Sequence, residues 1–384
     1  CAGHLSGRPS PLQIGRGVAP GWHGMHTRAV SEIVDRELAD FGWRPFCQAQ
    51  LDCALGEDCR PVRVTAVHRD QIEVAGPGFD ARIEPFRGDV SDEEDAATVG
   101  DWLILQGARP ERASRRLERF SLFKRKVAGK ERRVQLIAAN VDTLFIVSSC
   151  NQEFNLARLE RFLSLARTAE VFPVIVLTKA DLAEDAHEFE AETRAALPGV
   201  SVELINARDR DEAGRLAAWC GRGQTIAMVG SSGVGKSTLV NSLMGEEAQE
   251  TGAVRADDDR GRHTTSSRSL HRMATGGWLL DMPGMREIQL TEAGEGIDQV
   301  FAEIVELAED CRFADCAHDT EPDCAVRAAI EEGRLDANVL ERFQKLSQEE
   351  ARNTESIAER RARGRRFGKM VREVTRDKRA RGQE

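Results

Sequence analysis

The stretch Gly230-Ser231-Ser232-Gly233-Val234-Gly235-Lys236-Ser237-Thr238 decides the fold, because its first eight residues fit the phosphate-binding pattern GxxxxGK followed by Ser or Thr. The apolar run at 225–229 predicts a buried strand that enters this loop, and residues 237–244 predict a helix that leaves it. Such a loop can point its backbone N–H groups at a phosphate, while Lys236 adds a positive charge and the Ser237 hydroxyl can hold Mg²⁺. We therefore predict a nucleotide-phosphate site at 230–238. The alternative is a glycine-rich turn before an ordinary helix.

The segment 171–181 predicts a second strand of the same site, because an apolar run ends there in Thr178-Lys179-Ala180-Asp181. A carboxylate at a strand tip can accept hydrogen bonds from guanine N1–H and from the guanine 2-amino group, whereas adenine offers no such pair. Asp181 would therefore select guanine, and Lys179 would lie across the nucleotide. Thr178 stands where GTPases usually have Asn. The alternative is a strand-end lysine followed by an Asp that caps a helix.

A further strand is predicted at 200–207 and ends at Asn206-Ala207. GTPases usually place a Ser-Ala loop against the base at this point, so both residues are candidate nucleotide contacts. Asn206 as an ordinary turn residue is the alternative.

The short apolar segment 278–284 follows the phosphate loop and ends in Asp281-Met282-Pro283-Gly284, which fits the DxxG pattern of GTPases. In that pattern the Asp, here Asp281, holds Mg²⁺ through water, and the N–H of Gly284 would meet the γ-phosphate. An ordinary turn is the alternative. The polar loop 261–265 contains two hydroxyl groups suited to complete the Mg²⁺ shell, and we choose Thr265 over its neighbour Thr264.

Hydrolysis needs a group that orients the attacking water. Ras-type proteins place a Gln directly after the DxxG glycine, where this chain has Met285, and a thioether cannot orient water. His263 is the best candidate for this role, and Lys236 and Thr265 complete the predicted catalytic set. A solvent-exposed loop histidine is the alternative for His263. Turnover of the isolated protein is therefore expected to be slow.

In ordinary GTPases the phosphate loop comes first and the guanine motif follows the DxxG segment, whereas here the guanine motif and the loop at 206–207 precede the phosphate loop. A circular permutation explains this order, because a doubly wound sheet keeps every loop at its carboxyl edge whichever connection is cut. The sequence therefore predicts an α/β circularly permuted P-loop GTPase domain over 134–290 that binds GTP or GDP with Mg²⁺.

A cluster of metal-binding residue types follows this domain. Cys311, Cys316, His318 and Cys324 place three thiols and one imidazole within fourteen residues, enough for a closed tetrahedral site. This spacing predicts one structural Zn²⁺ per chain in a helical domain over 291–345. The alternatives are scattered buried cysteines beside a surface histidine, or disulfides, for which nothing else in the chain argues. The other cysteines are dispersed and are interpreted as free thiols.

Together, the permuted motifs, the segment 137–163, the loop 261–265 and the Cys/His cluster resemble the ribosome small-subunit-dependent GTPase A family of circularly permuted bacterial GTPases, over roughly residues 40–345. The resemblance implies a GTPase that is stimulated by the small ribosomal subunit, binds it and its rRNA, and acts in its late assembly. It also implies an oligonucleotide-binding (OB) fold for the segment before the GTPase domain.

The residues themselves predict a small barrel in that segment. Residues 60–106 read as short alternating strands separated by turn signals such as Gly76-Pro77-Gly78, so we expect an OB-like barrel over 45–110. Residues 1–44 are expected to be a disordered tail. The first 28 or so of them are rich in Gly, Pro, His and Arg, without an apolar stretch long enough for a signal peptide.

Charge is unevenly distributed along the chain, whose net charge is −10 over 384 residues. Residues 107–133 hold eleven Lys or Arg against three acids, and residues 351–384 hold twelve against five. We therefore expect a basic connector at 111–133 and a basic tail at 346–384 that contact RNA phosphates, the alternative being solvated helical faces. No apolar run reaches the roughly 18 residues of a membrane span, and we expect a cytoplasmic monomer.

Two other functions remain open at this point. An ATP-dependent kinase or ATPase would use the same phosphate loop, and Asp181 argues against it. A zinc and OB RNA-binding protein would keep the phosphate loop without catalysis, and the presence of Lys236, Ser237 and Asp281 argues against that reading.

Overall fold

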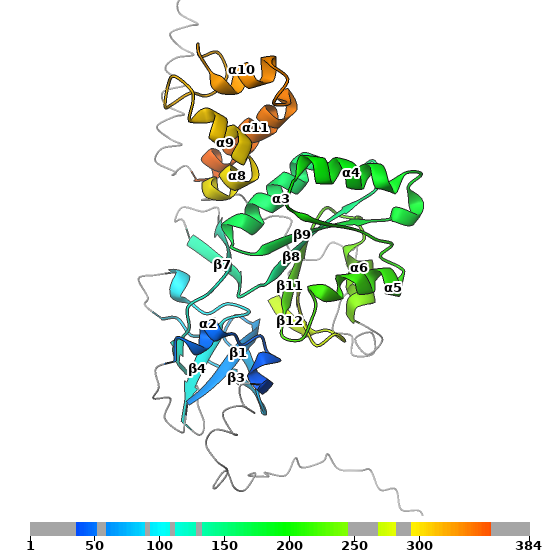
Figure 1. Cartoon of the computed structure of the whole chain (residues 1–384). Coiled ribbons are helices and arrows are strands. Elements are labelled where there is room, and N and C mark those ends of the chain that lie inside the picture. Colours follow the sequence, from blue (N-terminus) through cyan, green and yellow to red (C-terminus); the bar gives the residue numbers. More distant parts are fainter. Residues whose placement is uncertain are drawn as a thin grey trace, which may run out of the picture.

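The structure is a computed structural model that describes residues 36–51, 59–88, 93–107, 112–127, 133–244, 268–281 and 293–354 (Figure 1). Along the chain, antiparallel strands come first, a mostly parallel sheet with helices on both faces follows, and a group of helices ends the described part. In Figure 1 the sheet with its helices lies between the other two groups, so it forms the centre of the molecule.

The central sheet is built from strands that are largely buried. Its parallel strands are β8 (Thr143–Ser149), β9 (Phe172–Thr178), β10 (Ser201–Leu204), β11 (Thr225–Val229) and β13 (Trp278–Asp281). They lie in the order β10-β9-β8-β11-β13, and the antiparallel strand β12 (Arg268–Arg272) continues the sheet beyond β13. Every residue of β8 is buried, which explains why its sequence lacks the alternation of a half-exposed strand.

The strand order contains a reversal at the centre of the sheet. The chain first runs outward from β8 through β9 to β10, and then returns to place β11 on the other side of β8. Ligands of open α/β sheets bind at such a reversal, outside the carboxyl ends of the two central strands. The phosphate loop 230–236 follows β11 directly and therefore lies at this position.

Helices cover both faces of the sheet (Figure 1). The covering helices are α3 (Leu156–Thr168) and α4 (Ala186–Ala196) on one face, and α5 (Arg210–Gly214), the 3₁₀ helix η3 (Arg215–Ala218) and α6 (Lys236–Met244) on the other. Alternate side chains of β8 point to opposite faces of the sheet. Leu144 and Ile146 belong to one buried cluster, and Phe145 and Val147 belong to the other.

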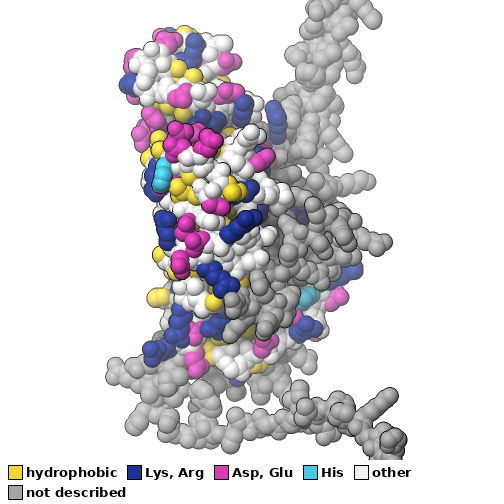
Figure 2. Space-filling view, turned by 90° about the vertical axis from the view of Figure 1, so that its right-hand side faces the viewer, with side chains coloured by type: hydrophobic (Ala, Val, Ile, Leu, Met, Phe, Trp, Pro, Cys, Tyr) yellow, Lys and Arg dark blue, Asp and Glu magenta, His cyan; other side chains and the backbone are white. Residues whose placement is uncertain are grey.

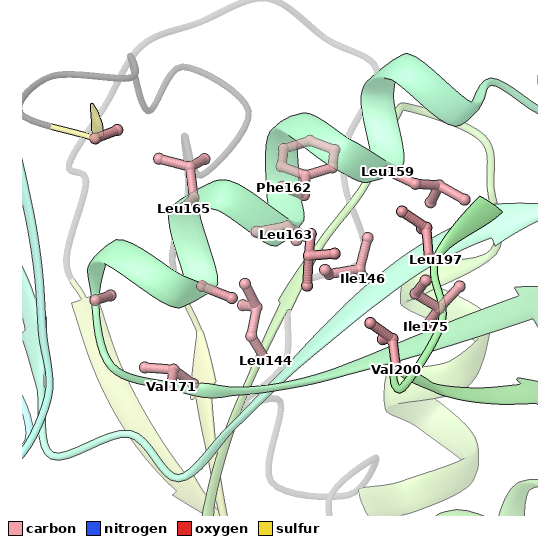
Figure 3. Packing of buried hydrophobic residues seen from close by; sticks show 14 of the residues in the cluster. Leu144, Ile146, Leu159, Phe162, Leu163, Leu165, Val171, Ile175, Leu197 and Val200 are labelled. Atoms are coloured by element: carbon pink, nitrogen blue, oxygen red, sulfur yellow. The ribbon is translucent and has the colours of Figure 1, made fainter. Parts of the chain in front are cut away.

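Helix α3 has two buried sides. Its first turn is capped by Asn155, whose side chain accepts a hydrogen bond from the Arg158 N–H at 2.9 Å. Figure 3 shows Leu163 between the helix and Ile146 of β8, whereas Leu165 points away from the strands. One continuous apolar cluster includes residues of the strands, of α3 and of the helices that follow residue 293, so α3 is the layer between the sheet and those helices.

The segment before the GTPase domain forms antiparallel strands. They are β1 (Cys59–Val67), β2 (Ile72–Gly76), β3 (Phe79–Ile83), β4 (Trp102–Gln106) and β5 (Ala113–Arg116), with the 3₁₀ helix η1 (Glu93–Asp95) between β3 and β4. They pair in the order β3-β2-β1-β4-β5 around a core that includes Val62, Val74 and Leu103. Pairing of Ala66 with Ser269 and of Val67 with Arg268 joins β1 to β12 at the edge of the central sheet.

The disordered tail expected over residues 1–44 was assigned too many residues, because residues 36–44 pack onto the rest of the molecule. Leu38 and Trp43 are buried, and the Trp43 ring meets the Trp102 ring edge to face at 4.7 Å between centroids. The short helix α2 (Pro45–Gln48) follows. These apolar residues are separated by polar ones without helix or strand periodicity, so the sequence pattern gave no sign of their burial.

The expected basic connector is instead folded. Its residues form β5, which pairs with β4, and β6 (Leu122–Val127), which pairs with β7 (Arg133–Ala139) in a separate two-stranded sheet. Much of its charge is already paired, as shown by Arg116 with Asp95 at 2.8 Å, Arg119 with Asp101 at 2.7 Å and Lys124 with Glu94 at 2.7 Å. Two of these three acids come from the acidic run at 89–97, so the two runs of opposite charge partly neutralise each other.

The described part ends in helices that cover α3. They are α8 (Gly294–Val300), α9 (Ala302–Ala308), α10 (Ala325–Glu331) and α11 (Ala337–Thr354). The backbones of α8 and α3 approach closely, because a Cβ at Gly296 would collide with the Ser164 carbonyl oxygen. Helix α11 runs past residue 345, where the helical domain was expected to end. None of the helices in the described ranges combines the length and apolarity that crossing a bilayer requires.

Candidate functional site

The phosphate loop takes its shape from glycine and from one buried anchor. Gly230 has φ +149° and a Cβ there would collide with the Val147 carbonyl oxygen, while Gly235 has φ +95°, which side-chain-bearing residues rarely adopt. Val234 is 1% exposed and fixes the middle of the loop in the core between the sheet and α6. The loop is therefore a rigid turn whose outer residues, Ser232 and Gly233, remain exposed.

Lys236 begins helix α6 and turns back over the loop. Its ammonium group donates to the Gly230 carbonyl oxygen at 3.0 Å and to the Ser231 carbonyl oxygen. Ser237 is exposed in the first turn of α6 and Thr238 is half-buried beside it. The backbone of Asp281 ends β13, which pairs in parallel with β11, so the DxxG segment begins next to the phosphate-loop strand.

Thr178 links the guanine motif to the phosphate loop. Its side chain lies at the end of β9, fully buried, with Oγ1 3.0 Å from the Ser148 carbonyl oxygen and also within hydrogen-bonding distance of the Val234 carbonyl oxygen. The same hydroxyl would be 3.4 Å from a Cβ on Gly235. The residue that departs from the usual Asn therefore connects the end of β9 to the middle of the phosphate loop.

The residues that follow Thr178 project beyond the sheet. Lys179 has φ +60°, a left-handed conformation that turns the chain sharply into the 3₁₀ helix η2 (Ala180–Leu182). Asp181 is exposed within η2. A carboxylate in this position is open to a base that lies along the carboxyl edge of the sheet.

Asn206 and Ala207 follow β10 at the same edge. The Asn206 side chain accepts a hydrogen bond from the Arg208 N–H at 3.0 Å, so it stabilises a turn, the simpler of its two interpretations. Ala207 is buried, and its carbonyl oxygen accepts a hydrogen bond from the Ser242 hydroxyl of α6 at 2.7 Å. Helix α6 is thereby tied to the loop after β10. Contact of either residue with the nucleotide stays a prediction.

Several predicted site residues lie outside the described residues. These are His263, Thr264, Thr265, Gly284 and Met285, and the same holds for the side chain of Asp281. Their assigned roles in catalysis and in Mg²⁺ binding stay predictions.

Arg158 is a residue of this site that the motif analysis missed. It lies in the first turn of α3, and its guanidinium donates to the Ser231 hydroxyl of the phosphate loop, 73 residues further along the chain. It belongs to the segment 137–163, but a contact across so many residues leaves no local pattern in the sequence.

The Cys/His cluster after α9 is brought together as predicted. The potential ligand atoms of Cys311, Cys316, His318 and Cys324 all lie within 4.8 Å of one another. The two sulfur atoms of Cys311 and Cys324 are 3.9 Å apart, and the His318 Nδ1 atom is 3.7 Å and 3.5 Å from them. Tetrahedral zinc with bonds of about 2.3 Å to sulfur and about 2.05 Å to nitrogen requires separations of about 3.8 Å and 3.6 Å. The residues therefore fit a tetrahedral ion bound through Nδ1 of the imidazole.

The loop around these ligands is held by a carboxylate and by α11. Glu321 accepts hydrogen bonds from its own N–H and from those of Ala317, Asp319 and Thr320, which lower the pKa of its carboxyl group to about 2. The Gln344 side chain of α11 donates to the Ala317 carbonyl oxygen at 3.0 Å. His318 itself has φ +59° and is 9% exposed.

Two ligands are already biased toward their metal-binding protonation states. Burial lowers the pKa of His318, which keeps the ring neutral. Burial opposes ionisation of Cys311, but hydrogen bonds from the backbone N–H groups of Val326 and Ala325 and from the Cys324 and Cys316 thiols together outweigh this effect, so the pKa of the Cys311 thiol is lowered. Neutral imidazole and thiolate are the forms that bind metal ions.

Comparisons with known proteins identify the family to which this chain belongs. The sequence profile described as RsgA GTPase matches residues 116–291. The chain is 47% identical over 346 residues to "Small ribosomal subunit biogenesis GTPase RsgA 2" of Vibrio parahaemolyticus, an alignment that covers 90% of this chain and 95% of the relative. It is 48% identical over 324 residues to "Small ribosomal subunit biogenesis GTPase RsgA" of Mesorhizobium japonicum, covering 83% and 91%. The chain belongs to the RsgA GTPase family.

Solved structures agree with this assignment at the level of the fold. YjeQ from Thermotoga maritima matches with a TM-score of 0.54 at 23% identity, covering 75% of this chain and 97% of that one. YloQ, described as a circularly permuted GTPase, matches with a TM-score of 0.53 at 23% identity, covering 80% and 100%. The predicted circular permutation is therefore confirmed.

Membership of the RsgA family also decides between the functions that the sequence left open. The protein is a GTPase, so GTP and GDP with Mg²⁺ are its ligands, and the ATPase, kinase and non-catalytic alternatives are set aside. The loops after β9, β10 and β11 meet at the carboxyl edge of the sheet, the position at which open α/β sheets bind their ligands.

Proposed function

We propose that this protein couples GTP hydrolysis to binding of the small ribosomal subunit and acts late in the assembly of that subunit. The observation that carries the proposal is the near full-length likeness to relatives named for small-subunit biogenesis. The link from Thr178 to Val234 supports it further, because it ties the base-reading strand and the phosphate loop into one nucleotide site.

In the proposed site, Lys236 stabilises the β and γ phosphates while Ser237 and Thr265 hold Mg²⁺ directly. Asp281 would hold the ion through water, and the Gly284 N–H would meet the γ-phosphate. His263 would orient the attacking water, since the chain has Met285 after the DxxG glycine. Helix α8 begins shortly after this glycine, so loss of the γ-phosphate could reposition the C-terminal helices.

We assign RNA binding to the antiparallel strands β1 to β5 as an OB-like barrel. Arg60, Arg69 and Arg115 are exposed there, and none of the three forms an ion pair within the described residues. On the face drawn in Figure 2, Lys and Arg side chains are interspersed with acidic ones and are more frequent in the lower half. Contacts of such residues to phosphates are sequence-independent and depend on salt.

For the Cys/His cluster we propose one structural Zn²⁺ per chain. Three thiolates and one imidazole are typical ligands of structural zinc, and the spacing of the ligand atoms matches that ion. The ion would hold the loop between α9 and α10 in one conformation, next to α11. We also propose that the protein acts as a monomer in the cytoplasm.

The test of the proposed function is GTP turnover with and without purified small ribosomal subunits. We expect slow turnover alone and a large stimulation by small subunits, which falls as salt rises because phosphate contacts are screened. Purified large subunits serve as the control. Equal turnover in the presence and absence of small subunits would refute the proposed coupling.

Guanine selection by Asp181 is tested separately. Asp181→Asn should weaken GTP binding and favour xanthine nucleotides, because the new amide can donate to the 2-oxo group of xanthine. Competition of GTP, xanthosine triphosphate and ATP for the wild type and the variant measures this. Unchanged GTP preference in the variant would remove Asp181 from the base site.

A further inference from the structure

The phosphate loop is held from two sides, and the two sides use different residues. Thr178 and the buried Val234 hold its middle, as described above. Its first part meets two cations at a single residue, since the Ser231 carbonyl oxygen accepts from Lys236 and the Ser231 hydroxyl accepts from Arg158. Lys236 belongs to the loop's own helix, whereas Arg158 comes from α3 on the opposite face of the sheet.

Arg158 is attached to a fixed backbone. It lies in the capped first turn of α3, and the next residue, Leu159, is 2% exposed within the apolar cluster between the helix and the strands. The other side of α3 packs against the C-terminal helices, so the helix has little freedom to shift. The Arg158 side chain itself is half-buried and reaches over the edge of the sheet to the loop.

We propose that Arg158 is a positioning residue for the nucleotide, acting through the Ser231 hydroxyl. By holding Ser231, it restricts the part of the loop that is otherwise exposed at Ser232 and Gly233. Binding of a phosphate requires the backbone N–H groups of this part of the loop to point in fixed directions.

The role differs from that of a residue that touches the γ-phosphate. A guanidinium that acts only in the transition state lowers kcat when removed and leaves the affinity for GDP unchanged. A positioning residue sets the loop before the nucleotide arrives, so its removal weakens GDP and GTP binding to a similar degree. A solvent-accessible charged hydrogen bond of this kind should contribute about a fivefold change in affinity.

The experiment is a double-mutant cycle on the full chain, with N-methylanthraniloyl-GDP as the fluorescent probe and with thermal unfolding measured for each variant. Arg158→Gln and Ser231→Ala should each weaken GDP binding by about fivefold. The double variant should be no weaker than either single one, because both changes remove the same interaction. Arg167→Gln is the matched control, since it removes a charge from the same helix about 14 Å further along the axis.

Two results would overturn the proposal. If Arg158→Gln weakens binding as much in the Ser231→Ala background as in the wild type, Arg158 acts on the nucleotide directly. If Arg158→Gln binds GDP like the wild type, it has no role in nucleotide positioning. If GTP turnover persists in all variants, the GTPase assignment holds whichever result the binding experiment gives.

Discussion

Thr178 joins the end of β9 to the phosphate loop through a single hydroxyl group. The hydroxyl carries one proton, so it donates to either the Ser148 or the Val234 carbonyl oxygen at a given moment, and both oxygens are nearby. Asn at this position would offer two amide protons. Thr178 therefore donates one hydrogen bond at a time where Asn could donate two, and its contribution depends on this one proton.

Replacement of Thr178 by Val should separate the guanine motif from the phosphate loop. Val has nearly the same shape but no hydroxyl, so a buried carbonyl oxygen loses its donor, at a cost of about 1–2 kcal/mol. We expect GTP and GDP affinity to fall by about tenfold, measured by equilibrium titration. Thr178→Ser should retain most of the affinity.

The control for this change is Thr193→Val in α4. The Thr193 hydroxyl is also buried and donates to the Phe189 carbonyl oxygen at 2.7 Å, but it is not part of the nucleotide site. That variant should lose some thermal stability and keep its nucleotide affinity. Equal loss of affinity in both variants would show that the Thr178 effect is one of general stability.

At the level of elements, α3 is held to α11 by a buried ion pair. The Arg342 Nε atom lies 2.9 Å from both carboxylate oxygens of Glu160, which is 2% exposed. Burial raises the pKa of Glu160, although the hydrogen bond from Arg342 opposes the rise. The pair therefore compensates only part of the cost of placing the carboxylate between two helices.

Arg342→Met should destabilise the protein in a pH-dependent way. Without Arg342 the folded-state pKa of Glu160 rises further above its unfolded value, so the protonated form is favoured in the folded protein. Stability is then fully present below the unfolded pKa and is lost as pH rises toward the folded pKa. We expect a loss of about 3 kcal/mol at pH 8 and a much smaller loss at pH 5, measured by urea unfolding.

Lys345→Met on the same helix is the matched control, because Lys345 pairs with Glu341 at an exposed site where ion pairs contribute little. It should change stability only slightly at either pH. If Arg342→Met costs the same at pH 5 and pH 8, Arg342 stabilises α3 through packing and not through its charge.

The loop between α9 and α10 is mostly exposed, and its two buried residues, His318 and Cys324, are both potential metal ligands. Cys316→Ala should lower the bound zinc from about one ion per chain to a small fraction, because a structural site that loses one of four ligands binds far more weakly. The segment 311–324 should then exchange its amide hydrogens rapidly. Metal analysis and hydrogen exchange measure these two effects.

Cys220→Ala is the control for the metal site. Cys220 is fully buried, and burial raises the pKa of its thiol to about 12, so it is an inert core residue. The variant should lose some stability and retain the metal. Protein that is purified without chelator and contains no zinc would contradict the assignment.

The elements that the sequence predicted best are those with short, local signals. The strand expected at 225–229 is β11, and the four residues of the Cys/His cluster lie together as their spacing predicted. The ion pair of Glu160 and Arg342 joins residues 182 positions apart, and each residue alone looks like an ordinary charge on a helix surface. Such a pairing depends on how the helices pack, which periodicity does not reveal.

At the level of the whole molecule, Arg63 joins three segments. It is 1% exposed, and its guanidinium donates to the carbonyl oxygens of Phe41 at 2.7 Å, Asn140 at 3.0 Å and Gly100 at 3.4 Å. Burial lowers its pKa to about 10. Phe41 lies in the N-terminal segment 36–44, Gly100 precedes β4 and Asn140 precedes β8, so a single side chain joins these three segments.

Arg63→Met should loosen this junction. The apolar replacement leaves buried carbonyl oxygens without donors, and we expect a loss of about 3 kcal/mol in the free energy of unfolding. Residues 36–44 should become sensitive to proteolysis before the rest of the molecule unfolds. Arg82→Met, at an exposed ion pair on β3, is the control and should have little effect.

The sequence indicated the central domain more fully than the ends of the molecule. The strands β9, β11 and β13 are apolar runs that are each followed by a motif, and both signals lie within a few residues. The folded state of 36–44 and the neutralised basic run depend instead on distant partners such as Trp102 and Asp101. A run of charge in a sequence therefore does not distinguish a surface for RNA from one that is already paired.

The permuted order also decides when the site can form during synthesis. Strand β11 leaves the translating ribosome roughly 75 residues after the end of β8, which at roughly 5–20 residues per second takes about 4–15 s. Until then, the edge of β8 that later pairs with β11 is an apolar edge without its partner, open to incorrect strand pairing. The proposed guanine motif at 178–181 is synthesised within this interval, so it can bind a nucleotide together with the phosphate loop only after residues 230–238 have also emerged.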